Sequence, residues 1–235
     1  DQPEDSDAPW FGFIDNRHEL LKLPQARWDS PHPTEIDTAF SVEEGGKFAK
    51  WYLYFTSGPF YWKTNYNFKP TIANQGVCQN CDVIEVGRTS EKWPGIPFLG
   101  PNRVNAAFYS EPEDQIYFLR DNQYWPWHVI KNGLDSQAPL LLQKKWKRIT
   151  QTAAGDVFTE EPELKDIDSA YAIINSLGQE KVWFFKGEEY FETTNNGIVK
   201  KGKIKDLFKT TGEGWKSPIK DLDGAFRVRP AKPRV

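Results

Sequence analysis

The sequence is short of cysteine, histidine, methionine and long hydrophobic runs. Its 235 residues include two cysteines, three histidines and no methionine. Two cysteines do not build a disulfide framework, and a chain of this length has room for a core that needs none. No stretch approaches the roughly 20 apolar residues of a membrane-spanning helix, and the mean hydropathy is −0.68. The sequence therefore predicts one fair-sized domain or two small ones, without a membrane span.

Neither sign of charge is in clear excess. The formal net charge is −3 and the isoelectric point is about 5.7. A nucleic-acid-binding surface needs a surplus of lysine and arginine, so we expect no nucleic-acid partner. The chain begins at Asp1 with acidic and polar residues. We interpret it as a processed or excised mature chain and expect a secreted protein or one of a storage compartment, with the cytoplasm left open.

The two cysteines, Cys78 and Cys81, form a single C-x-x-C pair. A zinc site lacks a second pair or a nearby histidine here. A redox pair belongs at the start of a helix after a strand, whereas these residues lie in the polar stretch 74–81. We favour a local disulfide or unreactive thiols.

Aromatic rings are what the sequence has in abundance. Ten tryptophans, nine tyrosines and 16 phenylalanines make up 15% of the chain, while the hydrophobic fraction is only 38%. The core must therefore be built largely of rings. Because rings stand well on pleated strands, the composition favours an all-β fold.

A short phrase occurs four times, with the pattern aliphatic, Asp or Asn, small, Ala, aromatic. Its copies span residues 35–40, 103–108, 166–171 and 221–226. The acid or amide recurs at 37, 105, 168 and 223, at intervals of 68, 63 and 55 residues. Such intervals suit one propeller blade of several strands each.

A second phrase follows the first and has the form of a β-hairpin. Its copies, residues 54–62, 117–125 and 183–191, each hold two aromatic runs around a Gly- or Asn-containing turn. A phenylalanine and a tyrosine stand six residues apart in every copy. Residues 10–20 are a degraded copy, in which Glu19 replaces the tyrosine.

The fourth Asp phrase has too few residues after it for a hairpin of its own. We therefore expect the C-terminal strand at 223–228 to pair with the N-terminal hairpin and complete one blade, which would also remove an open sheet edge. The expected blades are 35–100, 103–163, 166–219, and 221–235 together with 9–34. Residues 203–208 suit one short helical turn, and 136–162 are interpreted as an outer blade edge plus a surface loop.

Together these phrases resemble the hemopexin-like repeat family. The resemblance rests on the four Asp phrases, the F-F-K-G-x-x-Y-F hairpin at 184–191 and the W-P-G-I-P linker at 93–97, and it covers roughly residues 9–235. Family members include serum haem scavengers, metalloproteinase C-terminal domains, vitronectin and plant seed albumins. The resemblance implies a single four-bladed β-propeller.

The resemblance also implies an ion in the central channel. In the family, backbone carbonyls at the repeated acid and at the alanine two residues later face this channel and hold calcium or sodium, with chloride as a further candidate. The small alanine is expected to keep the channel open. The positions carried over are Asp37, Ala39, Asn105, Ala107, Asp168, Ala170, Asp223 and Ala225. Alternatively, the acid side chains only hydrogen-bond to a neighbouring blade and no ion matters.

The aromatic residues of the Asp phrase, Phe40, Phe108, Tyr171 and Phe226, are expected to pack between blades. The repeat does not explain several other rings, which are either wedges between blades or an exposed surface for sugars, haem or other flat ligands. Those we single out are Trp51, Trp125, Trp127 and Trp146.

We expect a binding module rather than an enzyme, because no G-x-S-x-G, P-loop or H-E-x-x-H motif occurs. Its ligand would be a small molecule, a glycan or a protein. Haem binding through His32 or His128 and a lectin role for the unexplained rings are the alternatives, and a polyamine in an acidic channel is a further one. The oligomeric state is left open.

Overall fold

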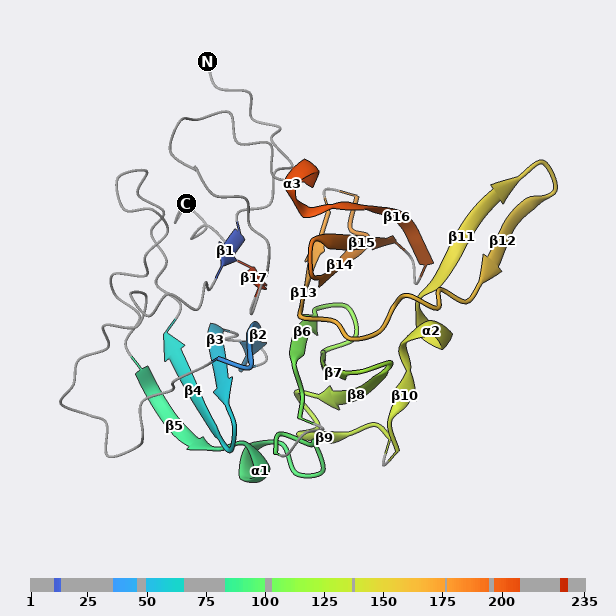
Figure 1. Ribbon diagram of the computed structural model, residues 1–235. Coiled ribbons are helices and arrows are strands. Elements are labelled where there is room, and N and C mark those ends of the chain that lie inside the picture. The colour runs from blue at the N-terminus through green and yellow to red at the C-terminus, as the bar shows by residue number, and fades with distance from the viewer. Residues whose placement is uncertain are drawn as a thin grey trace, which may run out of the picture.

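The computed structural model (Figure 1) describes nine segments of the chain. They are residues 11–13, 36–45, 50–65, 83–99, 103–136, 138–175, 177–194, 197–207 and 225–227. The fold is all-β, as predicted, with three helical turns.

Three antiparallel meanders supply most of the strands. The first contains β2 (Thr38–Glu44), β3 (Lys50–Ser57), β4 (Phe60–Asn65) and β5 (Val83–Arg88) in sequential order. The second contains β6 (Ala106–Ser110), β7 (Gln115–Arg120) and β8 (Gln123–His128), and β8 also pairs with the short strands β9 (Gly133–Leu134) and β10 (Leu140–Leu141). The third contains β13 (Ser169–Ile174), β14 (Glu180–Lys186), β15 (Glu189–Thr194) and β16 (Gly197–Lys203).

The three predicted hairpins are present as β3–β4, β7–β8 and β14–β15. Each turn holds two residues, and the first of them, Gly58, Asp121 or Gly187, has a φ of 51–53°. Two-residue hairpin loops require this left-handed conformation because it matches the twist of the flanking strands. The hairpins are therefore repeated in backbone conformation as well as in sequence.

The strands formed by the Asp phrase lie together in the middle of the molecule (Figure 1). β2 contacts β6, and β6 contacts β13. The C-terminal strand β17 (Ala225–Arg227) contacts both β13 and β2. The innermost strands of the four repeats thus contact one another in sequence, and the last contacts the first.

The predicted pairing of the chain ends is confirmed. β1 (Phe11–Phe13) pairs antiparallel with β17, with Phe11 opposite Arg227 and Phe13 opposite Ala225. Asp223, His18, His32, Cys78 and Cys81 lie outside the described residues.

Each of the three meanders is followed by a helical turn. These are α1 (Thr89–Lys92), α2 (Leu142–Lys145) and α3 (Ile204–Leu207). The amide of each first residue donates to a carbonyl of the preceding hairpin turn, at Pro59, Asn122 and Glu188, over 2.8–2.9 Å. The helical turn expected at 203–208 is confirmed, and α1 and α2 are its equivalents.

Residues 136–162 differ in part from the expected edge and surface loop. β10 does form the outer edge of the second sheet, but α2 follows it. A further hairpin of β11 (Lys147–Thr152) and β12 (Gly155–Thr159) comes next. This hairpin extends the third sheet, because β11 pairs in parallel with β16 at Lys147 and Arg148.

Among the described residues, none of the helices has the length and apolar character needed to cross a membrane.

Candidate functional site

In the three described copies the acid or amide directly precedes the inner strand, and the side chains of Asp37 and Asp168 bond to the adjacent hairpin turn. In the first repeat the amide of Gly58 donates to Asp37 Oδ2 over 2.6 Å. Arg103, from the next repeat, places its Nε 3.2 Å from Asp37 Oδ1. The carboxylate therefore fixes its own blade's turn and pairs with the neighbouring repeat.

The third repeat has the same bond from the turn amide to the acid. The amide of Gly187 donates to Asp168 Oδ2 over 2.5 Å, and the amide of Asp168 donates to the carbonyl of Phe185 over 2.9 Å. In the second repeat the amide of Asn105 donates to Leu119 over 3.1 Å, while the buried Asn105 Oδ1 has no hydrogen-bond partner among the described residues.

The Asp37–Arg103 pair matches the structural alternative that the sequence left open, a bond to the neighbouring repeat. The bond from Gly187 to Asp168, in contrast, lies within one repeat. Asp37 and Asp168 are both engaged within the protein, so an ion on the axis would take backbone carbonyl oxygens. Among the described residues, no group of three or more His, Cys, Asp or Glu side chains is placed to hold a metal ion. The ligation predicted at Asp37, Asn105, Asp168 and the alanines of the phrase stays a prediction.

The alanine side chains of the first three copies lie in the buried clusters of the core, and the prediction that the alanines keep a channel open stays a prediction. Ala107 lies in one buried cluster with Phe40, and Ala170 lies in another with Phe108. Successive residues of a strand point to opposite faces, so an inner strand presents its alanine to one neighbouring sheet and its aromatic ring to the other. The small side chain leaves room for the ring from the preceding repeat. Ala225 lies at the start of β17, opposite Phe13.

The predicted packing of rings between repeats is confirmed for Phe40 and Phe108. Phe40 stacks on Tyr54 of its own sheet at 5.6 Å and meets Phe118 of the next sheet edge-on at 5.6 Å. Phe108 stacks on Tyr117 at 5.0 Å and meets Phe184 edge-on at 5.9 Å. Tyr171 likewise stacks on Trp183 at 4.9 Å.

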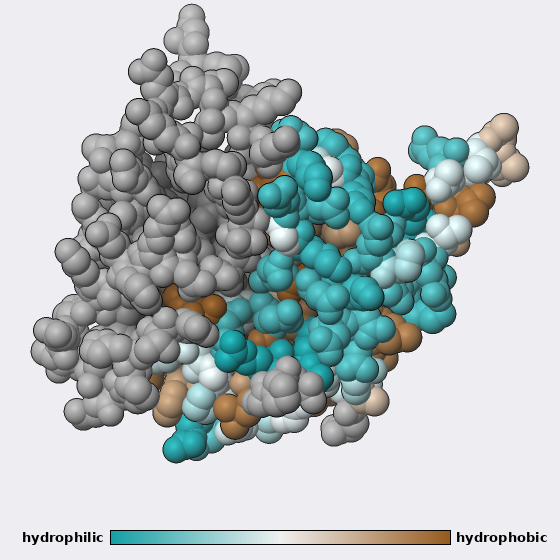
Figure 2. Space-filling view, in the orientation of Figure 1, coloured by the Kyte–Doolittle hydropathy of each residue, from teal (hydrophilic) through white to brown (hydrophobic). Residues whose placement is uncertain are grey.

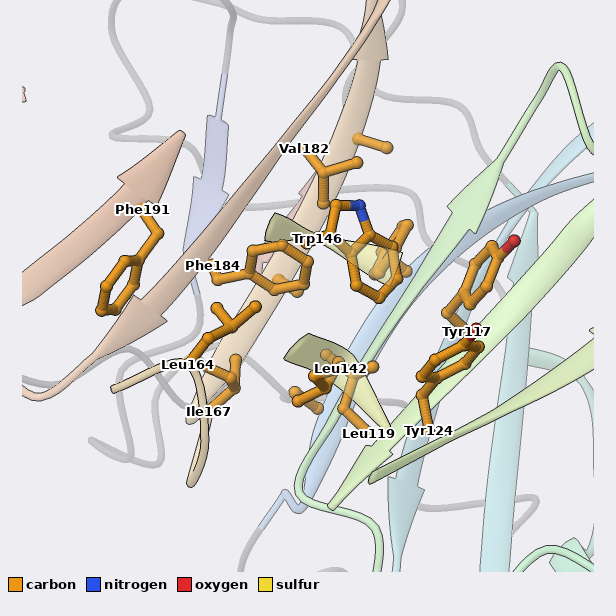
Figure 3. Packing of buried hydrophobic residues seen from close by; sticks show 14 of the residues in the cluster. Tyr117, Leu119, Tyr124, Leu142, Trp146, Leu164, Ile167, Val182, Phe184 and Phe191 are labelled. Carbon is orange, nitrogen blue, oxygen red and sulfur yellow. The ribbon is translucent and has the colours of Figure 1, made fainter. Parts of the chain in front are cut away.

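A tryptophan directly after a helical turn completes each of these two ring clusters. Trp93, after α1, contacts Phe40, Tyr54, Tyr61 and Phe118. Trp146, after α2, contacts Phe108, Tyr117, Tyr124 and Phe184 (Figure 3). Trp146 is only 2% exposed. It is thus the repeat equivalent of Trp93, which the sequence analysis missed because the two helical turns share no residue type except lysine at the end.

The other singled-out rings are also largely packed. Trp125 and Trp127 are buried in the cluster between the first and second sheets. Trp51 is half-buried and packs edge-on against Tyr109 at 5.9 Å. For Trp125, Trp127 and Trp146, burial favours the alternative of wedges between blades. His128 is half-buried at the end of β8, with its Nδ1 3.1 Å from Asp114 Oδ2.

Two buried tyrosines of the core donate hydrogen bonds to carboxylates. Burial raises the pKa of the Tyr54 hydroxyl, and the hydrogen bond to Glu44 adds to this shift. The Tyr117 hydroxyl donates to Glu113, which also accepts from Lys145 Nζ at 2.8 Å. Both phenols stay neutral donors across the physiological range.

Glu180, where the second and third sheets meet, has a different environment. Burial raises the pKa of its carboxyl to about 7; Ser110 opposes this shift and Glu113 adds to it. Sequence reasoning missed this residue because its burial depends on the contact between two repeats.

Comparison with solved structures identifies the fold. A hemopexin-fold protein from cow pea superposes with a TM-score of 0.52 and 18% identity, over 81% of this chain and 76% of that one. This chain has a hemopexin-like fold. A Cicer arietinum lectin with two metal-binding sites gives a TM-score of 0.53 at 16% identity, over 82% and 77% of the two chains. A hemagglutinating plant albumin from the same species gives 0.51 at 16% identity, over 74% and 69%.

Sequence comparison leads to a second group of proteins. Human matrix metalloproteinase-21 is 30% identical over 107 residues, which are 46% of this chain and 16% of the relative. The mouse protein is 23% identical over 197 residues, 80% of this chain and 30% of the relative. The chain thus spans less than a third of the length of these curated relatives. No protein-family model matches it.

Proposed function

We propose that this chain is a non-catalytic binding module, built as a four-bladed propeller with a hard cation on its axis. The observation that carries the proposal is the order of contacts among the inner strands, from β2 to β6, β13, β17 and back to β2. Four strands that contact one another in this cyclic order surround a common axis. The blades proposed are 35–100, 103–163, 166–219, and 221–235 with 9–34, with the β11–β12 hairpin at 147–159 joined to the sheet of the third blade.

The cation would bind to main-chain oxygens. The carboxylates of Asp37 and Asp168 are already hydrogen-bonded to turn amides. Carbonyl oxygens from four converging strands form a ring of hard ligands that suits Ca²⁺ or Na⁺. The proposed ligands are the carbonyls of residues 37, 39, 105, 107, 168, 170, 223 and 225, with chloride a further candidate for the channel.

Calorimetric titration with CaCl₂ and with NaCl tests the cation. Binding of a cation to the folded state raises the melting temperature by mass action. We expect heat of binding and a higher melting temperature with one of these ions, and reversal by EDTA if the ion is calcium.

The substitution Asp37→Asn is the matched variant, because asparagine occupies the same position in the second repeat. Carbonyl ligation predicts that this variant keeps its cation affinity within about threefold, since the backbone is unchanged. Absence of any ion-dependent heat or melting shift in the parent protein would refute the cation.

A glycan is the ligand class that a specific observation favours. Two of the structural neighbours are a plant lectin and a hemagglutinating albumin. Trp51, half-buried beside Tyr109, is the singled-out tryptophan that retains exposed ring area. A glycan array and a hemagglutination assay test this ligand, with signal expected for the parent and Trp51→Phe but lost in Trp51→Ala. A signal that survives in Trp51→Ala excludes this ring.

A further inference from the structure

The β11–β12 hairpin is an addition to the repeat unit. The described residues between α1 and β6 contain no strand, whereas residues 147–159 after α2 form a complete hairpin. None of these hairpin residues belongs to a buried cluster, although Leu142, Trp146, Leu164 and Ile167 on either side all do. The buried clusters therefore contain no hairpin residue, although Ile149 packs against Gly197 and Arg148 pairs with Glu161.

The outer strand of this hairpin presents an open edge. β12 stands last in the third sheet and pairs with β11 alone among the described strands. All five of its residues are exposed, including Val157 at 45% and Phe158 at 55%. The hairpin projects from the body, and part of its surface is hydrophobic (Figures 1 and 2). An edge like this is a template for another strand.

β12 also lacks the residues that usually protect an edge. Lysine, proline and bulges block edge-to-edge pairing in natural sheets. The segment Gly155–Thr159 contains no lysine and no proline, and Asp156 is its single charged residue. Its ladder with β11 is regular from Arg148–Thr159 to Thr152–Gly155.

We propose that β12 binds β12 of a second copy of this chain, antiparallel, with a two-fold axis through Val157. A two-fold axis perpendicular to the sheet places the same face of both copies on the same side of the joined sheet. Opposed residues must then have the same parity along the strand, because side chains alternate between faces. The axis therefore passes through a residue, and the candidates in the middle of the strand are Asp156, Val157 and Phe158.

Charge selects one of these three registers. An axis at Asp156 sets two carboxylates directly opposite each other, and an axis at Phe158 sets Asp156 opposite the partner subunit's Glu160. Like charges in directly opposed positions destabilise a strand pair. An axis at Val157 sets Val157 opposite its own copy and Asp156 opposite the partner subunit's Phe158, with no like charges opposed.

The resulting dimer joins the third sheet of one copy to the third sheet of the other, so that they form one continuous sheet. The interface consists of a five-residue edge and the exposed parts of Val157 and Phe158, which is small for a stable dimer. We therefore expect a dimer whose population depends on protein concentration in the micromolar range or above.

Sedimentation velocity over a concentration series, from about 1 μM to about 1 mM, measures this association. The parent chain is expected to shift from monomer to dimer. Val157→Lys and Val157→Glu each place like charges on the axis, so each variant is expected to stay monomeric. An equimolar mixture of the two is expected to associate again, because position 157 then pairs a lysine with a glutamate.

Substitutions at the adjacent position separate this register from a general hydrophobic contact. Phe158→Lys faces the partner subunit's Asp156 and is expected to keep the dimer, whereas Phe158→Glu faces the same carboxylate and is expected to lose it. Equal losses in both variants would overturn the register. The proposal as a whole is wrong if the parent stays monomeric at about 1 mM, if Val157→Lys associates like the parent, or if the mixture stays monomeric. Unchanged melting temperatures check that every variant is folded.

Discussion

At the scale of single residues, the sequence reports more about packing than about chemistry. Phe40 and Phe108 recur because each fills the space beside an alanine of the next repeat. Asp37 and Asp168 recur because a turn amide needs an acceptor there. Much of the repeat is thus explained by the structural needs of one blade against the next.

Glu180 is expected to make the stability of the folded chain depend on pH. Its folded-state pKa is about 7, raised by burial above the ordinary 4.5, so the folded chain binds more protons than the unfolded chain between these values. The stabilisation from protonated Glu180 is fully present below pH 4.5 and is lost as the pH rises through 7. Its upper bound is about 3 kcal/mol.

We expect the variant Glu180→Gln to remove this pH-dependent loss of stability. Its free energy of unfolding relative to the parent should rise from pH 4.5 to about 7.5 and then level off, as measured by urea denaturation at several pH values. Glu160→Gln is the control, because Glu160 is exposed and pairs with Lys144. A parallel pH profile for parent and Glu180→Gln would contradict the assignment.

At the scale of elements, glycines on the outer strands fit against tyrosines of the hairpins. Gly87 on β5 lies opposite Tyr61, and Gly202 on β16 lies opposite Tyr190. A Cβ at either glycine would stand 2.8 Å from the tyrosine Cε1. The Tyr61 hydroxyl donates to Glu85, which restrains the ring against moving aside.

Gly87→Ala is therefore expected to lower the free energy of unfolding by about 1–3 kcal/mol through overpacking. Gly133→Ala in β9 is the matched control, because the nearest atom to its added Cβ is 3.9 Å away. Thermal melts of both variants make the comparison. Equal melting temperatures for the two would show that the ring shifts without cost.

The elements that the sequence predicted are those set by local spacing. Inner strands, hairpins and the pairing of β1 with β17 follow from phrases that repeat in both residue type and interval. The helical turn α2 was missed because its role depends on one backbone hydrogen bond to Asn122 rather than on a shared side chain. The β11–β12 hairpin has no counterpart among the described residues between α1 and β6, so comparison with the first repeat could not reveal it. The repeat phrases do not cover Trp125, Trp127 and Trp146, so the sequence leaves both packing between blades and a ligand surface open for them.

At the scale of the whole molecule, a short strand pair joins the N-terminal and C-terminal parts of the described chain. β17 pairs with β1 and contacts both β2 and β13. Deletion of residues 1–13 leaves β17 without its strand partner. We expect a fall in melting temperature of about 5 °C or more and faster amide exchange in β2 and β13.

Deletion of residues 147–159 is the control for this truncation, since that hairpin contributes nothing to the buried clusters. We expect it to leave the melting temperature and the exchange of β2 and β13 near those of the parent. If the two deletions have equal effects, the terminal pairing does not hold the inner strands together.

The pairing of β1 with β17 has a mechanical consequence. Phe11 lies opposite Arg227, so the chain enters β1 and leaves β17 at the same end of the ladder. A force that pulls residues 11 and 227 apart therefore breaks the inter-strand hydrogen bonds one after another, as in a zipper, instead of loading them all at once in shear. A pull on the chain ends would release the terminal pair at low force, while the three central meanders stay folded.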